Sequence, residues 1–200
     1  SAFLWGARQT GKSTLLKMLY PDAQYFDLLL NNEFERLQRN PDLLREILSA
    51  SDPSSLTIID EIQRIPALLN EIQWLIVNQK RKFILSGSSP RNILRSGANL
   101  LGGRAIRYEL YPLVYPEIND FDLLKALNNG LLPRHYISSD PKKLLSAYLG
   151  SYLKDEIMNE ARTRNVGSFT RFLEVAAFSN GEMVNYANIA SDCGVSAPTV

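Results

Sequence analysis

The sequence predicts an α/β fold in which a parallel sheet is sandwiched by helices and is followed by a smaller helical region. Short apolar runs alternate with helical segments in the first part of the chain, which is typical of such a sheet. Strand signals fade beyond about residue 117, and the 200 residues are 45% hydrophobic, enough for one sizeable core. We therefore expect a core at residues 1–116, a helical region at 117–180 and the start of a helix-turn-helix-like segment at 181–200.

Five apolar segments are expected to form the strands: Ala2–Trp5, Gln24–Leu30, Leu56–Asp60, Phe83–Leu85 and Ala105–Leu110. Four segments between them are expected to be helices: Ser13–Tyr20, Glu33–Arg39, Pro41–Ser49 and Pro66–Val77. Pro21 ends the first helix because proline cannot donate a backbone hydrogen bond, whereas Pro41 suits a first helical turn. Apolar residues recur at helical spacing in the fourth segment.

The later part of the chain shows helical patterns only. We expect helices at Phe121–Asn128, Lys142–Arg164, Phe169–Phe178 and Asn185–Ser191. In the last segment Gly194 marks a turn, and Ser196 is placed to cap a second helix that has Pro198 in its first turn. This shape fits DNA contact through the second helix, but a packing or assembly module has the same shape and is favoured, because the first residues of the second helix carry no arginine or lysine.

Composition excludes several classes of protein. The formal net charge is +1, so no global basic field attracts nucleic acid. Cys193 is the only cysteine, which excludes an internal disulfide and fits a reducing cytoplasm, the location we expect. No apolar run is long enough to span a membrane, and Phe3-Leu4-Trp5 is too short for a signal-peptide core. Because both ends interrupt expected elements, we expect the chain to be part of a longer protein.

A glycine-bearing loop follows the first expected strand. Residues 6–13 match the pattern G-x-x-x-x-G-K-[ST], in which backbone N–H groups and a helix N-terminus bind phosphate oxygens. Lys12 adds a positive charge for the β and γ phosphates, and Ser13 offers a hydroxyl to Mg²⁺. A glycine turn with a surface lysine is the alternative, but the strand before and the helix after argue against it. The predicted ATP-binding residues are Gly6, Ala7, Arg8, Gln9, Thr10, Gly11, Lys12, Ser13 and Thr14.

Two carboxylates follow the expected strand Leu56–Asp60. Asp60 is placed to hold Mg²⁺ through its water shell, and Glu61 to polarise an attacking water as a general base. The alternative is that these carboxylates belong to an ordinary solvated turn. The phosphate-loop motif at residues 6–13 argues against that alternative. No Asn-Lys-x-Asp element of a GTPase is present, and small-metabolite kinases usually lack the Asp-Glu pair. The pattern favours an additional-strand ATPase, in which one strand lies between those of the two motifs.

Polar residues after the next strand are candidates for sensing the γ-phosphate. Ser86 is the first choice and Ser88 the second, although either serine could equally satisfy local backbone groups. Arg104 follows Gly102-Gly103 and is the preferred candidate for an arginine that stabilises transition-state charge, in the same chain or from a neighbouring subunit. Most such arginines are solvated or paired with carboxylates.

Taken together, these motifs resemble a known family. Gly6–Thr14, Leu56–Gln63, residues 85–89, 103–105 and 108–113, and Gly130-Leu131-Leu132-Pro133 are similar to prokaryotic AAA-like P-loop ATPases with an uncharacterised C-terminal domain of the DUF4143 type. The resemblance implies ATP and Mg²⁺, Walker A and Walker B roles for Lys12, Ser13, Asp60 and Glu61, and a sensor-like role near Ser86. Similar family members continue at the C-terminus into a winged-helix-like segment.

Two functions stay open on this basis. The first is a Mg²⁺-dependent ATPase that acts as a conformational switch or motor, with Glu61, Lys12, Ser86 and Arg104 as catalytic candidates and Ser13 and Asp60 as metal ligands. The second is a nucleotide-gated binding or regulatory module that turns over slowly or not at all and is linked to DNA. ATP is the expected partner in both; a homo-oligomer and DNA are further candidates, and no membrane partner is expected.

Overall fold

The computed structural model describes residues 1–95, 101–152 and 166–200. It divides into two compact units, Ser1–Pro141 and Lys142–Val200, which are described separately.

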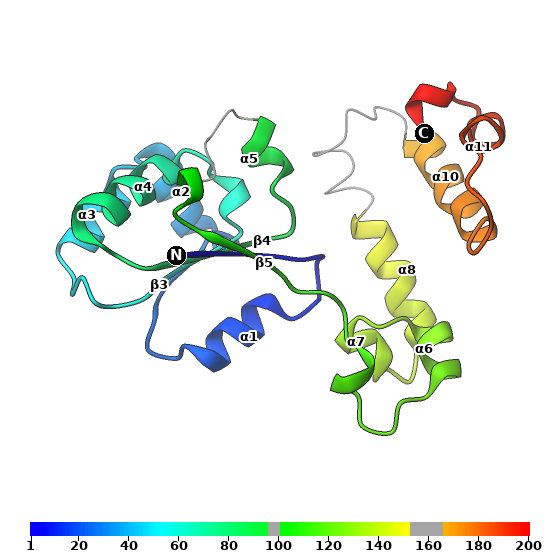
Figure 1. Cartoon of the computed structure of the whole chain (residues 1–200), viewed down its shortest axis with the longest axis horizontal. Helices are drawn as coiled ribbons and strands as arrows, with labels where there is room; N and C mark the ends of the chain where they lie inside the picture. The colour runs from blue at the N-terminus through cyan, green and yellow to red at the C-terminus, as the bar shows by residue number, and fades with distance from the viewer. Residues whose placement is uncertain (96–100, 153–165) are drawn as a thin grey trace. The chain divides into compact units, whose positions relative to one another are not determined.

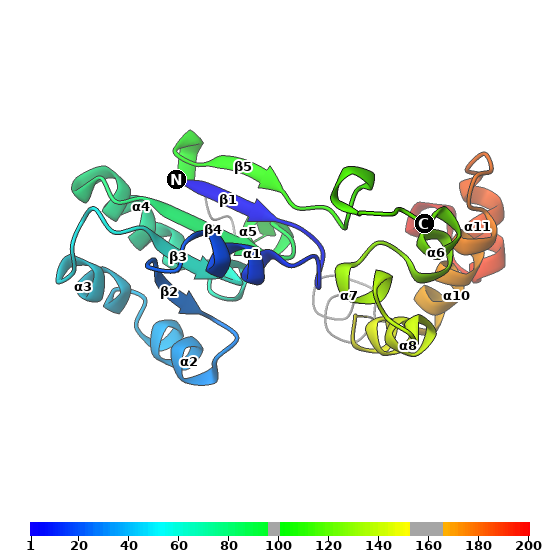
Figure 2. The same ribbon diagram turned by 90° about the horizontal axis from the view of Figure 1, so that it is seen from below.

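The first unit is built on a five-stranded parallel sheet whose order is β2-β3-β4-β1-β5 (Figure 2). Its strands are β1 (Ala2–Trp5), β2 (Gln24–Asp27), β3 (Thr57–Asp60), β4 (Phe83–Gly87) and β5 (Ile106–Glu109). β4 lies between β3 and β1 and pairs with both. This order confirms the additional-strand α/β fold predicted from the sequence, because one strand separates those that carry the two motifs.

Helices cover both faces of the sheet. α1 (Lys12–Leu19) lies on one face, and α3 (Leu43–Ser49) and α4 (Leu68–Gln79) lie on the other, beside α2 (Asn31–Arg39) and α5 (Arg91–Arg95) (Figure 1). Short 3₁₀ turns occur at η1 (Ile62–Arg64) and η2 (Leu101–Gly103). The main core joins inward side chains of the central strands to the apolar faces of α3 and α4, and includes Phe3, Ile59, Phe83, Leu85, Leu44, Leu48, Leu69, Ile72 and Leu75.

The second strand is shorter than predicted. The sequence suggested Gln24–Leu30, but β2 ends at Asp27. Leu28 N–H makes the last bond to β3, at 3.2 Å from Asp60 O. The Asp27 carboxylate then accepts from Leu29 N–H at 2.9 Å, and Leu30 N–H bonds to Asp27 O. This local turn competes with strand pairing, as is common for aspartate, so the apolar residues 28–30 continue as a turn.

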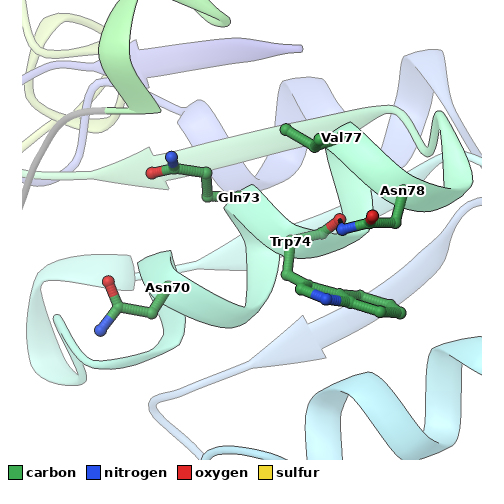
Figure 3. A pocket seen from close by; sticks show the side chains of 5 residues that line it. All are labelled: Asn70, Gln73, Trp74, Val77 and Asn78. Atoms are coloured by element: carbon green, nitrogen blue, oxygen red, sulfur yellow. Dashed lines mark hydrogen bonds between the residues drawn. The ribbon is translucent and has the colours of Figure 1, made fainter.

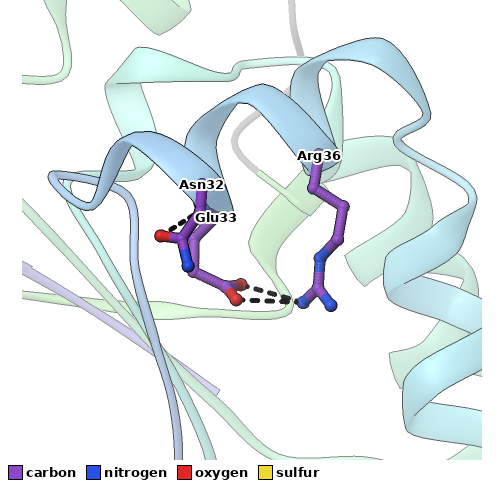
Figure 4. A network of polar contacts seen from close by, with 3 residues as sticks. All are labelled: Asn32, Glu33 and Arg36. Atoms are coloured by element: carbon purple, nitrogen blue, oxygen red, sulfur yellow. Dashed lines mark hydrogen bonds and ion pairs between the residues drawn. The ribbon is translucent and has the colours of Figure 1, made fainter.

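The predicted helices of the core are present with shifted ends, and short ones were missed. The sequence did not predict η1 or α5, because three to five residues are too few to show helical periodicity. On α2, the Arg36 guanidinium pairs with the Glu33 carboxylate one turn away at 3.0 Å (Figure 4). Both side chains are solvent-accessible, so this pair supports the helix only modestly.

The rest of the first unit is helical, as predicted after β5. It contains η3 (Tyr115–Glu117), α6 (Leu123–Asn129) and α7 (Pro133–Tyr136). α7 is a single turn that the sequence did not predict, and it begins with proline at its first position. It packs with α6, where Asp122 N–H donates to the Tyr136 hydroxyl at 3.2 Å.

The second unit is helical throughout its described part. It contains most of α8 (Pro141–Tyr152), together with α10 (Val166–Phe178), α11 (Tyr186–Cys193) and η5 (Ala197–Thr199). Residues 153–164 of the predicted helix Lys142–Arg164 lie outside the described residues. The Asn185 side chain caps α11 by accepting from two backbone N–H groups, and Gly194 ends the helix at φ +66°. A 3₁₀ turn follows where the sequence predicted the start of a second helix.

Candidate nucleotide-binding site

The phosphate loop connects β1 to α1 at the carboxyl edge of the sheet. Gly11 has φ +96° and immediately precedes α1, so the loop turns sharply into the helix N-terminus. Gln9 also has a positive φ of +66°. These left-handed conformations allow successive backbone N–H groups to line a concave surface, which together with the helix dipole favours an anion.

Lys12 is folded against its own loop. Its ammonium donates hydrogen bonds to the carbonyl oxygens of Gly6 at 2.7 Å and Ala7 at 3.0 Å, and the residue is only 5% exposed. The Thr10 hydroxyl donates to the same Ala7 carbonyl at 2.9 Å. The loop is thus pre-formed around a cation, and phosphate oxygens are the acceptors that such a buried ammonium favours.

Gly6 is required by close packing rather than by its φ angle. A Cβ at this position would lie 2.3 Å from the carbonyl oxygen of Leu110. The Leu110 N–H in turn donates to Trp5 O at 2.7 Å, so the chain after β5 is fixed against the start of the loop. A side chain at residue 6 would therefore force the loop and this segment apart.

Asp60 lies at the end of β3 and accepts three hydroxyl hydrogen bonds. Ser13 donates to its Oδ2 at 2.5 Å, and Tyr25 donates to the same oxygen at 2.7 Å. Ser86, directly opposite Asp60 in the neighbouring strand β4, donates to Oδ1. Asp60 is 2% exposed, so three strands and α1 meet at one buried carboxylate.

These neighbours keep Asp60 ionised. Burial by itself raises its pKa, but the hydrogen bonds from Ser13, Ser86 and Tyr25 and the charge of Lys12 outweigh burial and hold the pKa of Asp60 below its usual range. Burial and the Asp60 carboxylate raise the pKa of the Tyr25 hydroxyl, so Tyr25 stays a hydrogen-bond donor.

The chemistry of this donor set fits Mg²⁺. The Ser13 hydroxyl and an ionised carboxylate oxygen lie 2.5 Å apart, and hard oxygen ligands are those that Mg²⁺ prefers. Within the described residues no group of three or more His, Cys, Asp and Glu side chains could hold a metal by itself. A Mg²⁺ ion at Ser13 and Asp60 would therefore complete its shell with water and phosphate oxygens, as it usually does.

Glu61 follows β3 in a left-handed conformation, with φ +61°. Its carboxylate accepts a hydrogen bond from the side-chain amide of Gln63. Burial raises the pKa of Glu61 above its ordinary value, and the Asp60 charge adds to this, whereas the Gln63 hydrogen bond acts in the opposite direction. A carboxylate with a raised pKa is a better proton acceptor, which suits a general base.

Of the remaining residues predicted from the sequence, Ser86 and Ser88 lie near the site and Arg104 lies away from it. Ser86 donates a hydrogen bond to the Asp60 carboxylate, and Ser88 accepts one from the side-chain amide of Gln63, which in turn donates to Glu61. Arg104 precedes β5 at the amino edge of the parallel sheet, is exposed and donates to Gly102 O at 3.5 Å, whereas the phosphate loop follows β1 at the carboxyl edge. The structure thus brings together Lys12, Ser13, Asp60, Glu61 and Ser86, but not Arg104.

Two contacts in the site were missed by sequence reasoning. Tyr25 belongs to an aromatic strand whose pattern gave no sign that its hydroxyl reaches Asp60 across the sheet. Gln63 carries a weak signal, because it directly follows the apolar Ile62 after the buried strand, and a polar residue buried there needs hydrogen-bond partners.

A surface hollow on α4 lies outside this constellation. It is lined by Asn70, Gln73, Trp74, Val77 and Asn78, whose side chains project from that helix alone (Figure 3). None of these five residues belongs to the loop or to the carboxylate pair. Among the described residues, no helix combines the length and the apolar character that crossing a membrane requires.

The strand order, the phosphate loop and the carboxylate at the adjacent strand end define an AAA-like P-loop domain of the nucleotide-binding class. Comparison with family models agrees: the model of the AAA domain matches residues 1–119, more than half of the chain, and the chain belongs to that family. The model of a domain of unknown function (DUF8612) matches residues 120–200. The DUF4143 type suggested by the sequence is not confirmed. No curated protein matches the chain.

Proposed function

We propose that this protein binds ATP with Mg²⁺ and hydrolyses it, using the cycle as a conformational switch or motor. The observation that carries the proposal is the convergence of Lys12, Ser13, Asp60 and Glu61 at one edge of the sheet, with a 2.5 Å hydrogen bond joining the loop serine to the strand-end aspartate. Membership of the AAA domain family supports the nucleotide as ligand.

The binding step is assigned to residues 6–14. Their backbone N–H groups and the N-terminus of α1 would surround the phosphates, and the Lys12 ammonium would exchange its carbonyl partners for β- and γ-phosphate oxygens. Ser13 and Asp60 would hold Mg²⁺, which supplies charge neutralisation of the phosphates when bound.

The hydrolytic step is assigned to Glu61. Its carboxylate accepts a proton from a water molecule as the water oxygen bonds to the γ-phosphorus and the bond from that phosphorus to the ADP oxygen breaks. Lys12 stabilises the charge that moves to the leaving oxygens. Ser86 acts through its hydrogen bond to Asp60 and holds that carboxylate in place.

The alternative is a nucleotide-gated module with slow or no turnover. The position of Arg104 favours it for an isolated chain, because an arginine at the opposite edge of the sheet cannot reach the phosphates of its own site. We propose that, if Arg104 acts in catalysis, it does so from a neighbouring copy in a homo-oligomer. A link to DNA has less support, since residues 185–200 contain no arginine or lysine.

Glu61→Gln separates the two functions, because it removes the base and keeps the size of the side chain. We expect steady-state phosphate release from Mg²⁺-ATP to fall by about 10²–10⁴-fold, the usual contribution of a general base, while ATP affinity stays near the parental value. ATP affinity can be followed by the fluorescence of Trp5, which lies directly before the loop.

Glu46→Gln is the matched control, since Glu46 is an exposed residue of α3 remote from the loop. It should leave both quantities unchanged. Equal phosphate release by Glu61→Gln and the parental chain would refute hydrolysis at this site. Mg²⁺-ATP binding without measurable turnover in the parental chain would favour the gated module.

A further inference from the structure

Gln63 lies between Glu61 and the loop that follows β4. It lies on η1, just beyond β3, and is 8% exposed. Its side-chain nitrogen Nε2 donates to the Glu61 carboxylate and also to the hydroxyl oxygen of Ser88, at 3.2 Å. One buried amide therefore joins the residue assigned to water activation to the loop that follows β4.

The position of the Gln63 side chain depends on Gly87, the last residue of β4. A Cβ at residue 87 would lie 2.2 Å from Gln63 Oε1 and 2.7 Å from the ring of Trp5. The glutamine thus crosses directly over the strand end, next to the tryptophan that precedes the phosphate loop. Only the absence of a side chain at Gly87 allows this approach.

The arrangement is costly for the folded state. Gln63 Oε1 is buried and has no hydrogen-bond partner in the part of the chain that the structure describes. An unsatisfied buried acceptor destabilises a fold, and an apolar side chain of similar size would avoid the cost. The hydrogen bonds of Nε2 offset part of this cost, and both are directed at residues beside the proposed site, Glu61 and Ser88.

The chemistry of an amide suits the residue assigned as general base. A lysine or arginine in this place would form an ion pair with Glu61 and reduce its tendency to accept a proton. A neutral amide orients the carboxylate through one oxygen without adding charge, and it leaves the other oxygen for water. Orientation matters because misplacing a catalytic group is costly in rate.

We propose that Gln63 is a positioning residue that holds the Glu61 carboxylate in its productive orientation and couples it to the loop after β4 through Ser88. The inference rests on the proposed ATPase function. It adds a hydrogen-bonded connection through which the position of the loop after β4 affects the orientation of Glu61. Gln63 acts through Glu61 and does not itself touch the nucleotide.

Gln63→Leu tests this proposal, because leucine keeps the bulk and removes the amide. We expect the kcat for phosphate release to fall about 10- to 100-fold, with the Kd for Mg²⁺-ATP changed less than threefold. Gln73→Leu, the same substitution at a partly buried glutamine of α4 outside the site, should leave both values unchanged.

Ser88 supplies a second test that keeps Gln63 itself and removes only one of its hydrogen-bond partners. Ser88→Ala should lower kcat about three- to tenfold, and Ser88→Thr, which keeps the hydroxyl, should restore most of it. The double variant Gln63→Leu/Ser88→Ala should be no slower than Gln63→Leu alone, because Ser88 acts only through the amide. If Gln63→Leu does not fold, the two Ser88 variants carry the test.

Three results would overturn the inference while leaving ATP hydrolysis intact: parental kcat in Gln63→Leu, a fall in kcat matched by an equal loss of ATP affinity, or faster turnover. The last would mean that the amide restrains Glu61. Absence of Glu61-dependent phosphate release in the parental chain would instead refute the ATPase function, and this inference with it.

Discussion

The two units of the chain differ in how many polar side chains they bury. In Ser1–Pro141, the buried polar side chains include a group from segments at the carboxyl edge of the sheet, namely Thr10, Lys12, Asp60, Gln63 and Ser86. Thr57 and Arg81 are also buried but lie at the amino edge, and His135 is buried on α7. In the described part of Lys142–Val200, the buried polar side chain is Ser168, which accepts from Arg171 on the same helix.

The difference shows where a site can be inferred. Burying a polar group costs free energy unless it is satisfied, so buried polar side chains that converge on one carboxylate indicate a candidate site. Arg81 is the contrasting case, because its buried guanidinium donates to the backbone carbonyls of Asp52 and Ser51 and so has a structural role. Exposed polar residues on helices carry no such information, because solvent satisfies them at little cost. The first unit therefore supports a function argued from residues, and the second supports an account of its stability.

Among the variants that compare the two units, the largest expected effect is the loss of nucleotide affinity in Lys12→Ala. Hydrogen bonds from charged groups contribute about 1.5–3 kcal/mol, so we expect ATP binding to weaken about 10- to 100-fold in a titration followed by Trp5 fluorescence. Lys142→Ala, at an exposed lysine of the second unit, is the control and should bind as the parental chain does. Equal affinities in the two variants would remove the distinction drawn between the units.

Glycine-to-alanine variants in the two units are expected to change the free energy of unfolding in opposite directions. Gly6→Ala places a methyl group 2.3 Å from Leu110 O and should lower the free energy of unfolding of the first unit by about 1–3 kcal/mol. Gly150→Ala meets no atom within 4 Å on α8 and should stabilise that helix by about 0.5–1 kcal/mol. Denaturant unfolding of both variants measures this, and destabilisation by Gly150→Ala would contradict the open surroundings of that residue.

A smaller effect is expected from Tyr25→Phe, which removes one hydroxyl donor from Asp60. Since a hydrogen bond contributes about 0.5–1.5 kcal/mol, the Mg²⁺ concentration for half-maximal phosphate release should rise about two- to tenfold. Tyr186→Phe, at an exposed tyrosine of the second unit, should have no effect. A fall in the Mg²⁺ requirement of Tyr25→Phe would show that the hydroxyl competes with the metal.

The smallest effect is expected in the second unit. Asn185→Ala removes the cap of α11, in which Oδ1 accepts from Ala187 and Asn188 N–H at 3.1 Å. An exposed cap should contribute about 0.5 kcal/mol, visible as a small loss of stability with no change in ATP affinity. Asn188→Ala, on the same helix but not at the cap, is the control. Altered ATP affinity in Asn185→Ala alone would show that the two units are energetically coupled.

Much of the first unit was predictable because its signals are local. The motif from Gly6 to Ser13 lies within one loop, and the strand ending in Asp60 is continuous in sequence. The same locality explains the failures: Asp27 redirected the chain at the end of β2 through a side-chain turn, and η1, α5 and α7 are too short to show a period. In the described part of the second unit, α10 and α11 match the predicted helices in type but not at every end, as expected when boundaries depend on caps, whereas a 3₁₀ turn stands where a further helix was predicted to start.

The sequence by itself determined the fold class, the phosphate loop and the carboxylate pair, because each depends on residue types at fixed short spacing. Only the tertiary structure decided which distant side chains converge on them. Register places Ser86 directly opposite Asp60, and strand order puts β2 beside β3, so that the Tyr25 hydroxyl reaches the same carboxylate from within β2. Gln63 reaches Glu61 from η1, whereas the register of β5 places Arg104 at the opposite, amino edge of the sheet. Register is a property of paired strands, so no single segment of the sequence contains it.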